Sequence, residues 1–235
     1  MVRGSAGRSV GTVVSNVAVA LGCVLFLGGS AWAALVYRPY TVPTGSMEPT
    51  VAAGEHVLAE RISAGEIRRG DVVVFRDAAW GSAPEVKRVV GIGGDEVRSD
   101  GGRLTVNGEP VEEAYLSAEE RAATTSFSTT VDKGRLFLLG DRRSISVDSA
   151  SRLTDQARGS VPAGAVEARV DATVWPMGEA RMLPRPTGFA RLPGGISAPG
   201  PLTALVCAIA VGAVLILGGA AYGPLARRLG RRRAG

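Results

Sequence analysis

The chain has 235 residues, a formal net charge of +5 and a hydrophobic fraction of 46%. Its cysteines, Cys23 and Cys207, both lie in apolar stretches and its only histidine is His56, so the polar part offers neither a disulfide framework nor the ligand set that zinc requires. We expect no nucleic-acid partner either, because five arginines at 227–233 lie directly beside an apolar stretch, as basic residues that flank a membrane span do.

The first apolar stretch, residues 9–37, carries no charged side chain. A helix that crosses a bilayer core needs about 20 apolar residues. The sequence therefore predicts a cytoplasmic tail at 1–12 and a transmembrane helix at 13–36. Ala31-Trp32-Ala33 resembles the cleavage site of a secretory signal, but the apolar run exceeds the ~7–15 residues typical of such signals, which favours an uncleaved anchor.

Residues 37–183 contain short apolar runs separated by turn signals, which predicts a mostly β, antiparallel domain. The strand candidates are 70–76, 86–91, 95–98, 103–108, 134–140 and 168–175. Asp100-Gly101 is the predicted turn of one hairpin and Asn107-Gly108 is a second turn signal. Residues 114–123 are interpreted as a short helix or a loop.

The C-terminal part is rich in Pro and Gly from 184 to 200, which predicts a linker. A second transmembrane helix is expected at 201–222, followed by a basic tail at 223–235. Basic residues flank spans on the cytoplasmic side. We therefore expect both termini in the cytoplasm, the β domain on the outer side of the plasma membrane, and bilayer lipid as a partner.

Ser46 and Lys87 are the candidate nucleophile and base. Taken alone, a serine after glycine is most often a turn residue, and a strand lysine most often extends its amine to water. However, the chain has 27 Lys and Arg and only Lys87 and Lys133 are lysines. Arginine does not lose its proton in proteins, whereas a lysine among Val86, Val89 and Val90 can, because desolvation disfavours an ammonium.

His56 is the only histidine that could serve a Ser-His-Asp triad. It lies in an ordinary strand-like context, which favours a structural or exposed position. A serine mechanism therefore needs another base, and Lys87 is the best candidate.

Four segments of the chain form an ordered set of motifs: TGSMEPT at 44–50, GDVVVF at 70–75, KRVVGIGGD at 87–95 and GDRRSISVDS at 140–149. They occur in the order found in bacterial type I signal peptidases, which the chain resembles. Val161-Pro162 and Trp175-Pro176 resemble the closing segment of that family. The resemblance implies a catalytic β domain of the signal-peptidase type and a serine endopeptidase with a Ser-Lys dyad and no metal or cofactor. It also implies preprotein substrates, cut after small residues in an A-x-A pattern.

The resemblance further implies individual roles. Ser46 attacks the scissile carbonyl, Lys87 acts as general base and then general acid, and Ser146 orients the Lys87 amine. The Ser46 backbone N–H and the Thr44 hydroxyl form the oxyanion hole. The remaining implied residues are a supporting ion-pair set, Asp141, Arg143 and Asp148, and apolar substrate contacts, Tyr40, Val42, Met47, Val51 and Val86.

The sequence departs from the family pattern in the last motif. Arg142 stands where the family usually has Asn, and Ala150 stands where an arginine usually follows Asp-Ser. The arginine that pairs with Asp148, whether Arg143, Arg152 or Arg158, stays open.

Three other functions compete with this interpretation. A self-cleaving repressor is disfavoured by two spans and the lack of a DNA-binding segment. A peptidase specialised for one substrate, such as a pilin or matrix protein, and a catalytically silent anchored binding module both stay open. So does a contact with the protein translocation machinery.

Overall fold

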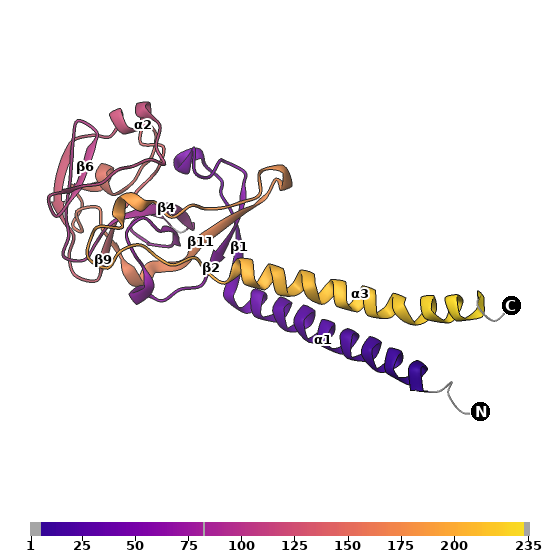
Figure 1. Ribbon diagram of the computed structural model, residues 1–235. Coiled ribbons are helices and arrows are strands. Elements are labelled where there is room, and N and C mark those ends of the chain that lie inside the picture. Colours follow the sequence, from indigo (N-terminus) through magenta and orange to yellow (C-terminus); the bar gives the residue numbers. More distant parts are fainter. Residues whose placement is uncertain (1–5, 82, 233–235) are drawn as a thin grey trace. The chain divides into compact units, whose positions relative to one another are not determined.

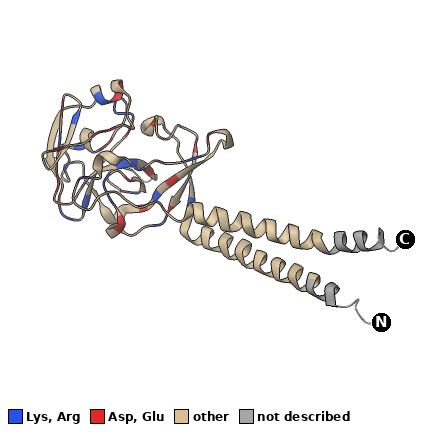
Figure 2. Cartoon of the chain, viewed as in Figure 1, with Lys and Arg blue, Asp and Glu red and all other residues tan. Residues whose placement is uncertain are grey.

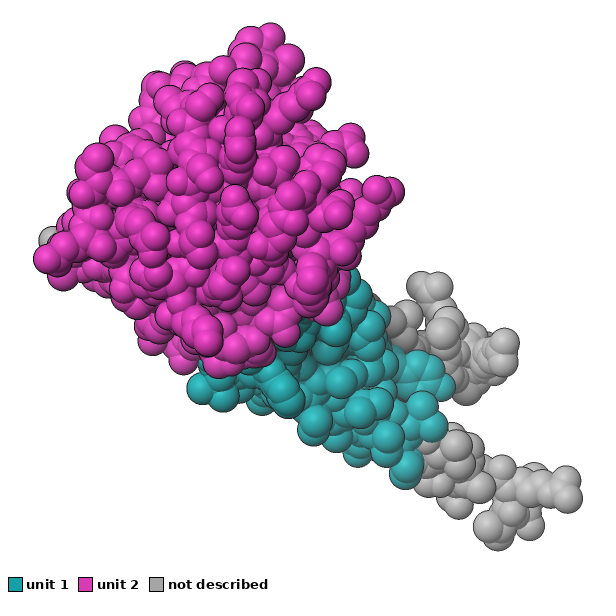
Figure 3. Space-filling view, turned by 90° about the vertical axis from the view of Figure 1, so that its left-hand side faces the viewer, with its two compact units in different colours: residues 1–36, 200–235 teal, residues 37–199 magenta. Residues whose placement is uncertain are grey.

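The computed structural model describes residues 6–81 and 83–232. It contains two compact units, one formed by residues 1–36 with 200–235 and the other by residues 37–199. Figure 1 labels the elements and Figure 3 colours the two units.

The first unit consists of two long helices, α1 (Ala6–Val36) and α3 (Leu202–Arg232). Gly11–Val36 and Leu202–Tyr222 have mean hydropathies of 2.1 and 2.5, with only 6% and 11% of their windows buried. Core helices of a soluble protein are mostly buried, so these two are candidate membrane spans, at the positions expected for 13–36 and 201–222. Neither of these two segments carries a charged side chain (Figure 2).

Small residues bring the two helices close together. A Cβ built on Gly22 would lie 2.8 Å from the Gly212 carbonyl oxygen, and one on Gly212 would lie 2.6 Å from the Phe26 nitrogen. The Ser15 hydroxyl also donates to the Gly219 carbonyl at 2.7 Å. Close backbone approach over glycine and a serine hydrogen bond are the contacts by which apolar helices associate in lipid.

The second unit contains two antiparallel sheets, which confirms the predicted mostly β fold. The larger sheet has the strand order β1-β2-β11-β3-β4-β9-β10, with β12 paired to β11. Its strands are β1 (Tyr37–Thr41), β2 (His56–Glu60), β3 (Val72–Phe75), β4 (Glu85–Ile92), β9 (Arg135–Leu139), β10 (Val161–Pro162), β11 (Val166–Trp175) and β12 (Arg181–Met182). β3 is buried along its whole length, as expected for a continuous apolar run with neighbours on both edges.

The smaller sheet has the order β7-β6-β5-β8. It comprises β5 (Glu96–Asp100), β6 (Arg103–Val106), β7 (Glu109–Pro110) and β8 (Phe127–Thr130), and the short helix α2 (Ala118–Ala122) lies between β7 and β8 in the chain. Asp100 pairs with Arg103, so the β5–β6 turn is Gly101-Gly102, one residue later than predicted. The Asn107-Gly108 turn is confirmed, since Val106 pairs with Glu109 and both turn residues have positive φ.

Most of the segment expected from composition to be a linker, 184–200, lies in the second unit and has side chains that pack in its core. Phe189 and Leu192 are buried in the same apolar cluster as Phe137. The Ser197 hydroxyl donates to the buried Asp71 carboxylate at 2.8 Å. Composition alone did not predict these contacts. A high content of Pro and Gly indicates irregular backbone, but it does not indicate whether the apolar residues between them are buried.

Candidate active site

Ser46 and Lys87 are brought together by two elements that are far apart in sequence. Ser46 lies in the single-turn 3₁₀ helix η1 (Gly45–Met47), which follows an extended Thr44. Lys87 lies on β4, opposite Val73 of β3. The Lys87 Nζ donates to the Ser46 Oγ at 3.3 Å, and the lysine side chain is only 5% exposed. This contact places a serine hydroxyl beside an amine in a largely desolvated setting, where a neutral amine could take the hydroxyl proton.

A groove of about 380 Å³ opens at this pair. It is lined by Ser46 and Lys87 and by nine further residues: Val42, Pro43, Thr44, Ala83, Pro84, Glu85, Val86, Ile145 and Val147. Most of these side chains are small or aliphatic. The groove can therefore hold an extended peptide with small apolar side chains beside the serine.

Two further polar groups reach the dyad. The Thr44 hydroxyl donates to the Ser46 Oγ at 3.3 Å, so it lies beside the oxygen that would attack a substrate. The Lys87 Nζ also donates to the Glu85 Oε2 at 3.2 Å, and Glu85 was not singled out from the sequence. The amine is therefore shared between a hydroxyl and a carboxylate.

The loop at 140–148 closes the site from another side. The Arg142 backbone N–H donates to the Ser46 carbonyl at 3.0 Å. Gly140 is needed there, because a Cβ on it would lie 2.1 Å from the Ser146 Oγ and 2.7 Å from the Ser46 carbonyl oxygen. Ser146 thus lies close to the loop that carries Ser46. The Lys87 amine, which Ser146 was expected to orient, donates instead to Ser46 and Glu85.

Arg88, the residue after the lysine, ties three of the sequence motifs together. Its guanidinium donates to the Asp141 carboxylate at 2.6 and 2.8 Å, with both side chains at most 2% exposed. The Thr50 hydroxyl, from the serine motif, donates to the same carboxylate and accepts from Arg88 at 3.3 Å. Burial acts to lower the pKa of Arg88, but the Asp141 carboxylate raises it on balance. These contacts hold the serine loop, β4 and the 140–148 loop in one arrangement.

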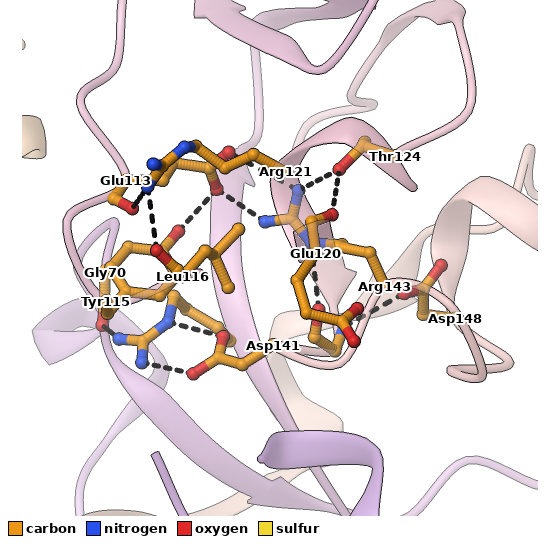
Figure 4. Close-up of polar contacts among 12 residues, drawn as sticks. Gly70, Glu113, Tyr115, Leu116, Glu120, Arg121, Thr124, Asp141, Arg143 and Asp148 are labelled. Carbon is orange, nitrogen blue, oxygen red and sulfur yellow. Dashed lines mark hydrogen bonds and ion pairs between the residues drawn. The ribbon is translucent and has the colours of Figure 1, made fainter. Parts of the chain in front are cut away.

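Arg143 has a different partner from the one expected. It forms an ion pair with Glu113 at 2.5 Å, both side chains being 2% exposed, and donates to Thr124 at 2.9 Å. Figure 4 shows Glu113, Tyr115, Thr124 and Arg143 in one buried polar cluster beside Asp141. Burial followed by the Glu113 charge raises the pKa of Tyr115 well above its ordinary value. The predicted set of Asp141, Arg143 and Asp148 therefore does not pair internally.

None of the three candidate arginines forms an ion pair with Asp148 within the described part of the chain. Arg143 pairs with Glu113, Arg152 with Asp155 and Arg158 with Asp132. The Asp148 carboxylate instead accepts N–H groups from Gly140 at 2.9 Å and Ala150 at 3.1 Å. Burial raises the pKa of Asp148, and these backbone donors oppose that shift. Asp148 is thus a buried hydrogen-bond acceptor that stabilises the 140–148 loop.

The predicted substrate contacts divide into two groups. Val42 and Val86 line the groove. Met47 and Val51 are fully buried in an apolar cluster and offer no surface to a peptide, while Tyr40 packs on that cluster and donates to Glu167 at 3.0 Å. His56 is exposed at the start of β2, in register with Thr41, and the side-chain contacts of Ser46 in the described part of the chain are with Thr44 and Lys87.

The residues of the site region that were missed from the sequence include Glu85, Arg88, Glu113, Ile145 and Val147. Arg88 follows Lys87 directly and Glu85 lies two residues before it. The alternation of side chains along a strand could therefore have pointed to both residues. Glu113 gave no local signal, because its partner is 30 residues away. No group of three or more His, Cys, Asp or Glu side chains suited to a metal occurs among the described residues.

Comparison with known proteins gives consistent matches. A family model described as "Signal peptidase, peptidase S26" matches residues 12–175. Signal peptidase I of Mycobacterium tuberculosis is 32% identical over 194 residues, which cover 60% of this chain and 66% of that protein. Signal peptidase IB of Staphylococcus aureus is 30% identical over 184 residues, which cover 71% of this chain and 90% of that protein.

A crystal structure of a signal peptidase I from Enterococcus faecalis V583 also matches. It is 27% identical, with a TM-score of 0.38, and the match covers 44% of this chain and 95% of that one.

Proposed function

This chain belongs to the signal peptidase family, peptidase S26, and we propose that it is a type I signal peptidase, a membrane-anchored serine endopeptidase that cleaves signal peptides from exported preproteins. The observation that best supports the chemistry is the 3.3 Å contact between Lys87 Nζ and Ser46 Oγ in a groove lined mainly by small and aliphatic side chains.

The reaction begins when the neutral Lys87 amine takes the Ser46 hydroxyl proton and the oxygen attacks the scissile carbonyl. The Ser46 N–H and the Thr44 hydroxyl stabilise the oxyanion that forms, a type of contact that typically contributes about 2.7–4 kcal/mol. The Lys87 ammonium then returns its proton to the leaving amine, which releases the mature protein. The same amine next activates a water that hydrolyses the ester on Ser46 and frees the signal peptide.

The groove walls account for substrate selection. Val42 and Val86 line the groove beside Ser46, and their aliphatic side chains favour small apolar substrate residues. A signal peptide would lie extended along residues 83–87 and form backbone contacts as an added strand. This arrangement favours cleavage after an A-x-A sequence.

The chain's location follows from its two candidate spans. Gly11–Val36 and Leu202–Tyr222 would hold the enzyme in the plasma membrane, with both termini cytoplasmic because the basic residues flank the spans. The catalytic unit would then act on the outer side, where signal peptides emerge from the bilayer. Lipid and, at the time of export, the translocation machinery are the corresponding partners.

The proposal is tested with the full chain in detergent and a preprotein that carries one A-x-A site. The wild type should release a product whose N-terminus is the residue after A-x-A, Ser46→Ala should release none, and His56→Ala should match the wild type. Cleavage by Ser46→Ala, or loss confined to His56→Ala, would refute the mechanism. A wild type that binds the preprotein without cutting it would identify a silent binding module.

A further inference from the structure

Glu85 is the one acidic side chain among the residues that line the groove. It lies two residues before Lys87, on the same face of β4. Its carboxylate accepts from the Lys87 Nζ at 3.2 Å, a distance similar to the 3.3 Å between that amine and Ser46. Since Glu85 is 28% exposed and Lys87 only 5%, the carboxylate also borders the space that a peptide would occupy.

The other charged groups near this part of β4 are engaged elsewhere. On β3, the residues opposite Lys87 and Glu85 are Val73 and Phe75, which carry no charge. Arg76, which follows β3, pairs with Glu167 of β11. Within the described residues, β3 and its extension therefore offer Glu85 no recorded ion-pair partner in place of Lys87.

The same holds for the serine loop and the 140–148 loop. Glu48 pairs with Arg142 at 2.6 Å and Arg143 pairs with Glu113. Asp141 pairs with Arg88, and Asp148 accepts backbone N–H groups. In the described part of the chain, the recorded ion pair of Glu85 is the one with the proposed catalytic base.

This pairing conflicts with the base role of Lys87. A carboxylate within about 4 Å favours the charged form of an amine, whereas proton abstraction from Ser46 requires the neutral form. Deprotonation of Lys87 would also leave Glu85 as a partly buried charge without a counter-ion, which is unfavourable beside an aliphatic groove.

We infer that Glu85 is a charge-selective substrate contact that prefers peptides with a cationic residue, Arg or Lys, beside the cleavage site. The inference rests on the proposed peptidase function. A substrate cation in the groove would pair with the Glu85 carboxylate in place of the Lys87 ammonium. Lys87 would then lose its proton to solvent and turn fully to Ser46. A substrate with Glu at the same position would face the Glu85 carboxylate and be disfavoured.

The test is a set of peptides that share one A-x-A site and carry Arg, Ala or Glu at each flanking position in turn. For the full chain in detergent, kcat/KM should follow Arg > Ala > Glu at one position, with about tenfold between Arg and Glu, a difference of about 1.4 kcal/mol. Glu85→Gln should reduce that ratio to within about twofold. The matched control Glu96→Gln, at an exposed site on β5, should keep the wild-type order. The ratio should also shrink at high salt, since Glu85 is partly exposed.

A second readout separates a substrate contact from a structural effect. With the Ala peptide, Glu85→Gln should reach its half-maximal kcat/KM at lower pH than the wild type, because the carboxylate that favours the ammonium is gone. Equal rates for Arg and Glu peptides in the wild type, or unchanged order and pH profile in Glu85→Gln, would overturn the inference while the peptidase function stands. Failure of the wild type to cut any peptide would instead count against the proposed function.

Discussion

Ser46 Oγ and Lys87 Nζ lie 3.3 Å apart although 41 residues separate them in the chain. The contact depends on the positions of η1 and β4 relative to one another. The Arg88–Asp141 ion pair and the Arg142 N–H bond to the Ser46 carbonyl fix these elements relative to one another. Mutations of the supporting groups should therefore affect catalysis or stability in ways that the geometry predicts.

Thr44 should contribute to the transition state and not to substrate binding. Thr44→Val removes the hydroxyl 3.3 Å from Ser46 Oγ with little change of shape. We expect kcat to fall about 100-fold or more with KM nearly unchanged, as for loss of one oxyanion donor. Thr44→Ser, which keeps the hydroxyl, should retain most of the activity. A change confined to KM would exclude the oxyanion role.

Gly140 should tolerate no side chain. Gly140→Ala places a Cβ 2.1 Å from the Ser146 Oγ and 2.7 Å from the Ser46 carbonyl oxygen, so both serines must move. Because a displacement of about 1 Å can reduce catalysis about 100-fold, kcat should fall at least tenfold. Gly65→Ala is the matched control, since nothing lies within 4 Å of its Cβ position. Equal kcat values for the two variants would show that the loop adjusts freely.

Arg88 should be essential for stability. Arg88→Met leaves the buried Asp141 carboxylate without its guanidinium partner, which typically costs about 3–5 kcal/mol. Arg98→Met, in an exposed pair with Asp100, should cost less than about 1 kcal/mol. Denaturant unfolding in detergent, followed by tryptophan fluorescence, measures both. Similar losses in the two variants would contradict the structural role of the Arg88–Asp141 pair.

Asp148 should make stability decrease as pH rises. Burial raises the pKa of Asp148 in the folded protein above the ordinary 3.8, which applies to the unfolded chain. Between pH 3.8 and this raised pKa, the folded protein therefore binds more protons than the unfolded chain. The folded state therefore loses stability across this window, by up to about 1.4 kcal/mol per pH unit. Asp148→Asn lacks this dependence. The free energy of unfolding of the wild type minus that of the variant should decrease with rising pH, and an increase would show that the carboxylate is stabilised in its charged form.

The six strands expected from the sequence were predictable because their signals are local: β3, β4, β5, β6, β9 and β11. β3 and β9 are continuous apolar runs, and the hairpin residues alternate between buried and exposed positions. The β5–β6 turn lies one residue later than predicted. Gly101 and Gly102 both have positive φ, so the composition of this segment does not decide between two adjacent turn positions. Ser46 and Lys87 became candidates through the scarcity of lysine, the position of His56 and the ordered motifs, and the structure places their side chains 3.3 Å apart.

The ion-pair partners were not predictable in the same way. Arg143, Arg152 and Arg158 are chemically equivalent candidates for Asp148, and the choice is made by packing between distant segments. Glu113 reaches Arg143 because α2 and the segment before it contact the 140–148 loop. The burial of Phe189 and Leu192 has the same origin, since it depends on the sheets that receive them.

The most direct test of the central claim replaces the lysine and then restores its amine. Lys87→Cys in a Cys23→Ser, Cys207→Ser background should be inactive, as loss of a general base typically costs about 10²–10⁴-fold. Aminoethylation of the introduced thiol, verified by mass spectrometry, rebuilds an amine of nearly the same length and should restore cleavage, while the same treatment of Ser46→Ala in that background should restore none. Full activity of Lys87→Cys before treatment, or no recovery after complete modification, would contradict Lys87 as the base.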